Sequence, residues 1–260
     1  MCIRWWFLAL LGCWLAAAAA EPLYWQAVEQ VRPDAETLAK AREKVEKHKD
    51  IVIRDDIDAK LPPFHRRPEK KVTKGETFCQ ICHLPLPHSK TLRTRSFLNM
   101  HSRFIACATC HFRPKDRHLD YRWLDYRTGK VIPASAERFR TGKDIDNSIP
   151  IDGWVKIAPF WGDEPVVPLP GDETARRIDR EWREGDLESR ARLQARLHLP
   201  LEEKGPECGA CHQEEKPLLD LEALGAPRRQ AALIYRHVIP QFFGRYTEED
   251  QRIRILDITR

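Results

Sequence analysis

The sequence has no cysteine to spare for a disulfide framework. Of its eight cysteines, two lie within the first 20 residues, and the other six all belong to three copies of Cys-x-x-Cys-His. Disulfides need cysteines that pair with each other. A structural zinc ion needs four ligands, whereas each copy offers two cysteines and one histidine. A thioredoxin-like dithiol would explain one Cys-x-x-Cys, but not a histidine after it three times over.

The three copies of this motif occupy residues 79–83, 107–111 and 208–212. Cys-x-x-Cys-His is typical of proteins that attach haem c covalently. The two thiols add to the vinyl groups of the porphyrin, and the histidine binds the iron from one face. The sequence therefore predicts three covalently bound haem c groups, with attachment by Cys79, Cys82, Cys107, Cys110, Cys208 and Cys211 and iron ligation by His83, His111 and His212.

Methionine is almost absent from the chain. There are two, Met1 and Met100, and the first belongs to the leader. A methionine opposite the motif histidine raises the reduction potential of a haem, and at most one haem here could have such a ligand. Because seven of the ten histidines lie outside the motifs, bis-histidine ligation with low potentials is the favoured prediction.

Several histidines are candidates for the second axial position. His101 lies six residues before Cys107, too close to reach the far side of that haem, so we assign it to the first haem. The other candidates are His88, His118 and His237, with His65 in reserve. His48 and His198 stand at predicted helix ends and are interpreted as surface residues.

Residues 1–20 have the pattern of a secretory signal peptide. Arg4 precedes an uncharged run over 5–20, which ends in small residues before Glu21. The run has 16 residues, fewer than the roughly 20 that a membrane span needs. We therefore expect a periplasmic protein with no membrane span after processing. The alternatives are a lipid anchor on Cys13, an uncleaved short anchor, and export to the cell surface.

The segments after the leader differ in pattern. Residues 21–74 predict an N-terminal helix and loop, and 75–120 a dihaem segment so short that the haems themselves must form its core. Residues 121–205 combine a β-containing insertion with charged helices, and 206–260 form a third-haem segment. The predicted fold class is mainly α with little regular structure, a haem-packed core and a small β-containing insertion between the second and third motifs.

Local patterns sharpen this outline. Aromatic and β-branched residues over 121–171 predict short strands and turns. Residues 172–198 predict one charged helix, or two that break near Gly185, and residues 227–243 predict a helix broken at Pro240. Residues 51–74 predict a loop with at most one strand. The short interval between the first two motifs predicts a closely packed haem pair, with the third haem farther off along the chain.

The chain lacks a strong excess of one charge. Its formal net charge is +5, and acidic and basic residues are well mixed. Each haem would add two propionates, which brings the loaded protein close to neutral. A basic polypeptide is therefore poor evidence for binding to nucleic acid, and no nucleic-acid partner is predicted.

Residues 79–114 resemble a pattern of multihaem c-type cytochromes, in which a lone histidine stands between Cys-x-x-Cys-His and Cys-x-x-Cys-His-x-x-Pro. The stretch is similar to the membrane-anchored quinol-dehydrogenase cytochromes of nitrate and nitrite respiration, and to the small dihaem subunits of periplasmic nitrate reductases. The resemblance carries over to Cys79, Cys82, His83, His101, Cys107, Cys110, His111 and Pro114. It implies a role in electron transfer. Unlike the quinol dehydrogenases, this chain has three motifs and a leader that looks cleavable.

Together these features predict an exported trihaem c-type cytochrome. It would carry electrons between redox protein partners through bis-histidine haems, without catalysing a reaction of its own. One alternative is a subunit of a polymeric or outer-membrane electron conduit, in which neighbouring chains of an oligomer share ligand histidines. Another is an oxidoreductase acting on nitrogen or sulfur oxyanions at one haem with a vacant axial site.

Overall fold

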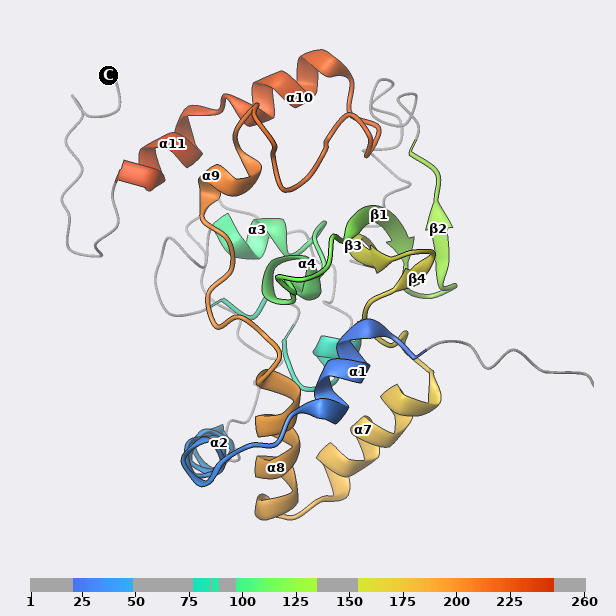
Figure 1. Cartoon of the computed structure of the whole chain (residues 1–260), viewed down its shortest axis with the longest axis vertical. Helices are drawn as coiled ribbons and strands as arrows, with labels where there is room; N and C mark the ends of the chain where they lie inside the picture. Colours follow the sequence, from blue (N-terminus) through green and yellow to red (C-terminus); the bar gives the residue numbers. More distant parts are fainter. Residues whose placement is uncertain (1–20, 49–76, 85, 89–96, 135–153, 246–260) are drawn as a thin grey trace, which may run out of the picture.

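The computed structural model of the chain describes residues 21–48, 77–84, 86–88, 97–134 and 154–245 (Figure 1). The predicted signal peptide over 1–20, including Cys13, lies outside these residues. So do the predicted loop over 51–74, with His65, and the side chain of His48.

Four helices form one layer of the molecule. They are α1 (Leu23–Gln30), α2 (Ala35–His48), α7 (Glu173–Glu184) and α8 (Leu187–His198), which lie together in the lower half of Figure 1. Of the two arrangements that the sequence allows here, the structure has two helices, with the break at Gly185. A Cβ atom added there would stand 2.4 Å from the carbonyl oxygen of Glu181, so a larger residue would collide with the helix end. Asp186 then caps α8 by accepting a hydrogen bond from the Ser189 amide at 2.8 Å.

Small side chains let α2 lie close to α8. Ala41 of α2 and Ala191 and Ala195 of α8 are buried together in one cluster. Helix α1 reaches α8 differently, because the Tyr24 hydroxyl donates to the Leu197 carbonyl at 2.6 Å. These contacts tie the N-terminal helices to the end of α8, just before the third motif.

A small antiparallel sheet forms the second layer. Its strands are β1 (Asp120–Asp125), β2 (Lys130–Ile132), β3 (Val155–Trp161) and β4 (Glu164–Pro165), in the order β2-β1-β3-β4. Trp123 lies opposite Ile132 on one side and Ile157 on the other. The predicted β-containing insertion is therefore present, and it contributes the centre of the described fold.

The two faces of the sheet contact different parts of the chain. Alternate residues of a strand point to opposite faces, and here both faces are apolar. One face clusters with the segment after the third motif, through Trp123, Val155 and Ile157 with Leu219 and Leu224. The other face clusters with the helical layer and the first two motifs, through Leu124, Ala158 and Phe160 with Tyr24, Phe78 and Phe112.

The haem-packed core expected for residues 75–120 stays a prediction, but this segment also contributes to a side-chain core. Phe78, Ala106, Ala108 and Phe112 are all buried. The ring of Tyr24 meets Phe78 at 6.0 Å and Phe112 at 5.5 Å, both edge to face. The partners that complete this core come from α1, the sheet, α7 and α8 rather than from within 75–120.

The remaining helices are short and carry the motifs or follow them. They are η1 (Phe78–Ile81), α3 (Asn99–His101), α4 (Cys107–His111), α9 (Cys208–Cys211), α10 (Arg228–Tyr235) and α11 (Val238–Arg245). The prediction of a helix break at Pro240 was wrong. The helices separate at Arg236 and His237, and Pro240 lies in the first turn of α11, where its missing N–H is not needed. The described chain is thus a set of helices around a small four-stranded sheet.

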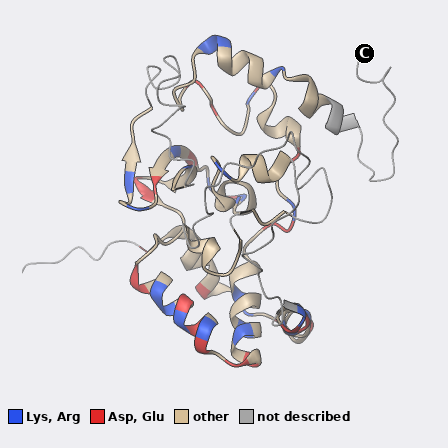
Figure 2. Ribbon diagram, turned by 180° about the vertical axis from the view of Figure 1, so that it is seen from behind, with Lys and Arg blue, Asp and Glu red and all other residues tan. Residues whose placement is uncertain are grey.

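Charges of both signs are mixed along α7, whereas the charged side chains of α8 are mainly basic (Figure 2). Arg183 pairs with Asp179 at 2.7 Å, and Arg192 with Glu188 at 3.3 Å. Such exposed pairs four residues apart each contribute about 0.3–0.5 kcal/mol. They give these helices a solvated surface of mixed sign. Within the described residues, no helix combines the length and the apolar character that crossing a membrane requires.

The sheet core makes a direct prediction. Leu124 of β1 is fully buried, whereas Leu233 of α10 is 64% exposed. Replacing Leu124 by alanine should lower the free energy of unfolding by about 2–5 kcal/mol, because it leaves a cavity between the sheet and the helical layer. Denaturant titration would measure the loss. The matched Leu233→Ala variant should change stability by less than about 0.5 kcal/mol, and equal losses in both would contradict this packing.

Candidate haem-binding sites

The second motif is fixed to strand β3 by hydrogen bonds around a single residue. The Ala106 amide donates to the Ile157 carbonyl at 2.9 Å, and the Ile157 amide donates to the Phe104 carbonyl at 2.7 Å. The Thr109 hydroxyl, buried inside the motif, also donates to the Ile157 carbonyl at 2.9 Å. A helix of one turn has little stability alone, so β3 decides where α4 lies.

The thiols of the first and second motifs are in contact. Cys79 and Cys107 share a side-chain hydrogen bond, which raises the pKa of the Cys79 thiol and lowers the pKa of the Cys107 thiol. Burial raises the pKa of Cys79 further, and the nearby ammonium of Lys156 helps to hold the pKa of Cys107 down. The two motifs therefore meet through their first cysteines.

The second and third motifs also meet. Burial raises the pKa of Cys110 to about 12, and the next contribution is the charge of Cys211 in the third motif. A Cβ placed on Gly205, just before the third motif, would lie 3.5 Å from Cys110 Cβ. Helices α3, α4 and α9 are grouped in Figure 1. The sequence separates the third motif from the first two, but the fold brings all three together with the second in the middle.

Two pairs of histidine rings, far apart in sequence, lie beside each other with their planes at 67° and 84°. The ring centres of His83 and His198 are 5.7 Å apart, and those of His101 and His212 are 6.0 Å apart. Imidazole nitrogens bind metal ions at about 2.0 Å, so two rings on opposite sides of one ion have centres about 6 Å apart. Each pair joins a motif histidine to one outside the motifs, and both separations fit a shared metal ion.

Four histidines have the proton on the nitrogen that suits metal binding. Backbone carbonyls accept hydrogen bonds from Nδ1 of His101 and His198 at 2.7 Å and of His111 and His212 at 2.8 Å. A carbonyl can only accept, so the proton is on Nδ1 and the lone pair is on Nε2. Hydrogen bonds of this kind fix the ring orientation of metal-binding histidines and raise the basicity of the other nitrogen.

Besides burial, the charge of His111 lowers the pKa of both His88 and His198. His198 already lies beside His83, so His88 is the described candidate left for His111. Its amide and its Nδ1 both donate to Asn99 Oδ1, at 3.0 and 3.1 Å, and Asn99 Nδ2 donates back to its carbonyl at 2.9 Å. Burial lowers the pKa of His88, the Asn99 hydrogen bond raises it, and the charge of nearby His111 lowers it. The Asn99 contact thus leaves Nε2 of His88 as the nitrogen for a ligand.

The structure changes two assignments made from the sequence. His101 was assigned to the first haem, but its ring lies beside His212 of the third motif. His198 was interpreted as a surface residue, and this was wrong, because it is half-buried beside His83. The one available signal for His198 was its position among apolar residues, with Leu197 before it and Leu199 after it.

Among the described residues, His118 and His237 have no ring contact of this kind. Burial lowers the pKa of the His212 ring, and His237 lies near enough for its charge to lower that pKa as well. His118 is exposed in the loop between α4 and β1. His237 is exposed between α10 and α11, and its Nδ1 accepts a hydrogen bond from the Ile239 amide at 3.3 Å. That bond puts the ring proton on Nε2, the opposite tautomer from the four histidines above.

Glu202 makes two hydrogen bonds to the histidine of the second motif and an ion pair just beyond that motif. Its amide donates to the His111 carbonyl at 2.8 Å, and its own carbonyl accepts from His111 Nδ1 at 2.8 Å. Its carboxylate forms an ion pair with Arg113, two residues beyond the motif. The segment before the third motif thereby orients the ligand of the second.

Several exposed apolar side chains are close in sequence to these histidines. Six of the eleven large apolar side chains that are exposed in the described chain stand within three residues of His83, His88, His101 or His198. They are Leu84, Leu86, Leu98, Met100, Phe104 and Leu199. A porphyrin has broad apolar faces that side chains of this kind could contact.

No family model, no curated protein and no solved structure matches this chain. The donor set itself therefore decides what the chain could hold. In the described part there is no group of three or more His, Cys, Asp or Glu residues arranged for a metal ion. A haem iron takes only two ligands from the protein, which is what each histidine pair provides.

The Glu202 contacts can be tested through stability. The Arg113 and Glu202 side chains are 29% and 39% exposed, so water screens their ion pair. Glu202→Gln should lower the free energy of unfolding by about 1 kcal/mol or less, measured by denaturant titration. Glu203→Gln, at the exposed neighbouring residue, should have no measurable effect. Equal losses in the two variants would show that the Arg113 pair contributes nothing.

Proposed function

We propose that this protein is a trihaem c-type cytochrome that transfers electrons. The three Cys-x-x-Cys-His motifs attach haem c through Cys79, Cys82, Cys107, Cys110, Cys208 and Cys211. The axial pairs are His83 with His198, His111 with His88, and His212 with His101. One observation carries the proposal. The ring centre of a motif histidine lies 5.7 Å from that of a second histidine in one pair and 6.0 Å in another.

The residues around each site have the roles expected for an electron carrier. When bound, haem supplies one-electron cycling between Fe(III) and Fe(II). The chain orients the ligand rings through their Nδ1 hydrogen bonds, and apolar side chains stand close to these histidines in sequence. Both axial ligands come from histidine, which favours low potentials. It also leaves no open position for a substrate, and so favours a carrier over an enzyme with a vacant haem site.

The arrangement of the motifs supports transfer along a series. The second motif touches the first through Cys107 and Cys79 and lies near the third through Cys110 and Cys211. The three haems would then form one connected group, whereas the sequence predicted a close pair with the third haem farther off. All six ligand histidines come from one chain, so a neighbouring chain need not supply one. Redox proteins of the periplasm are the proposed partners, in line with the resemblance over 79–114.

Haem stoichiometry tests the proposal directly. A haemochrome assay on the purified protein should give three covalently bound haems per chain. The double variant Cys208→Ala/Cys211→Ala should give two, because the third motif then has no thiol for attachment. A value of two for the unaltered protein would refute occupation of all three motifs.

Spin state tests the axial pairs. His198→Ala should convert one of three ferric haems from low-spin to high-spin in electron paramagnetic resonance, because His83 then lacks its partner. His198→Met should keep that haem low-spin and raise its potential. His118→Ala, at an exposed histidine outside the pairs, should leave all three haems low-spin. A high-spin signal from His118→Ala, or none from His198→Ala, would contradict the assignment.

A further inference from the structure

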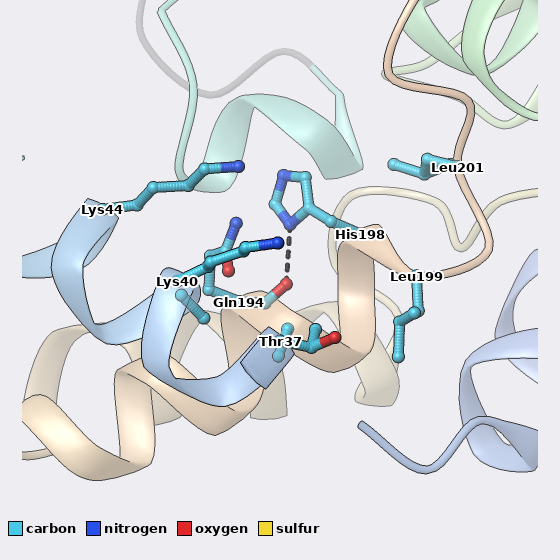
Figure 3. Close-up of a pocket in the computed structure, with 9 residues that line it drawn as sticks. Thr37, Lys40, Lys44, Gln194, His198, Leu199 and Leu201 are labelled. Carbon is cyan, nitrogen blue, oxygen red and sulfur yellow. Dashed lines mark hydrogen bonds between the residues drawn. The ribbon is translucent and has the colours of Figure 1, made fainter. Parts of the chain in front are cut away.

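A pocket of about 270 Å³ opens between α2 and α8, beside the imidazole of His198. Figure 3 shows Lys40 and Lys44 extending from α2 toward this ring, whose Nδ1 is bonded to the Gln194 carbonyl. Leu199 and Leu201 line another part of the pocket. It therefore combines two ammonium groups with an apolar wall, next to a proposed iron ligand.

The two lysines differ in their present partners. Lys40 pairs with Glu36 at 2.6 Å on its own helix, with both side chains well exposed. Among the described residues, Lys44 has no carboxylate at ion-pair distance. Burial lowers the pKa of His198, the Gln194 carbonyl raises it, and the Lys44 ammonium lowers it, in keeping with the position of Lys44 near the ring. Lys44 is thus a cation with free capacity for an anion.

The packing of α2 places these cations. Ala41 and Ala195 both line the pocket and belong to the alanine cluster that joins α2 to α8. Because alanine side chains are short, the helices approach closely and the lysines one residue before and three residues after Ala41 reach His198. Lys47, one turn beyond Lys44, does not line the pocket.

We propose that this pocket binds carboxylates, namely the propionates of the haem held by His83 and His198. The inference rests on the proposed function. A haem is an apolar ring that carries two carboxylates on its edge, and the pocket offers the matching chemistry, with leucines for the ring and ammonium groups for the propionates. Lys40 and Lys44 act as positioning residues, and their charge favours the reduced, less positive iron.

The test is a redox titration of the holoprotein, monitored through its visible absorption spectrum. In the double variant Lys40→Gln/Lys44→Gln, the midpoint potential of one haem should fall and those of the other two should stay unchanged. Lys44→Arg keeps the charge and should retain the original potential. Lys47→Gln is the matched control, because Lys47 pairs with Glu43 at 2.5 Å and is 70% exposed, against 2.6 Å and 67% for Lys40. It should leave all three potentials unchanged.

Each other outcome counts against the inference. Three unchanged potentials in the double variant, with three low-spin haems still present, would overturn it and leave the proposed function standing. Equal lowering of all three potentials, or the same shift from Lys47→Gln, would indicate a general charge effect and also overturn it. Absence of covalent haem from the unaltered protein would overturn both the inference and the proposed function.

Discussion

The structure depends on how three single-turn helices are held in place. A Cys-x-x-Cys-His turn is too short to keep a position of its own, so each copy takes its place from the surrounding fold. Strand β3 provides most of this support. Its residue Ile157 makes hydrogen bonds to the segment around the second motif, and its two faces pack toward the first and the third motif. Proteins that bind cofactors precisely gain from placing ligands on such rigid elements.

The residues between the second and third motifs therefore support the segments that carry the motifs. The strands β1 and β3 have apolar residues on both faces, which is typical of strands covered on both sides. One side contacts the third-motif segment, and the other contacts the helical layer with the first motif. Helix α8 then ends at His198, next to His83, so that the same stretch supplies both support and a proposed ligand.

The histidine pairs connect distant parts of the chain. His83 and His198, like His101 and His212, are more than 100 residues apart in sequence but have adjacent rings. A ligand set that closes such long loops exists only in the folded chain, so binding of a metal centre there would be coupled to folding. Under the proposed function, haem attachment and the final packing of the three segments would stabilise each other.

The sequence by itself determined the local features. It contains three Cys-x-x-Cys-His motifs, and it predicted the strands within 121–171 and, as one of two alternatives, a helix break near Gly185, because each depends on residues that are neighbours along the chain. For the proposed haems it also argues against methionine as the general axial ligand, since Met100 is the only methionine in residues 21–260.

Only the tertiary structure decided which residues meet. His198 ends a charged helix, and nothing in the adjacent sequence shows that His83 lies beside it. The sequence assigned His101 to the first of the predicted haems, but its ring lies beside His212. The third motif, far along the chain, lies near Cys110 because Glu202 and β3 bring the segments together. These contacts are set by long-range packing, which a local sequence pattern does not encode.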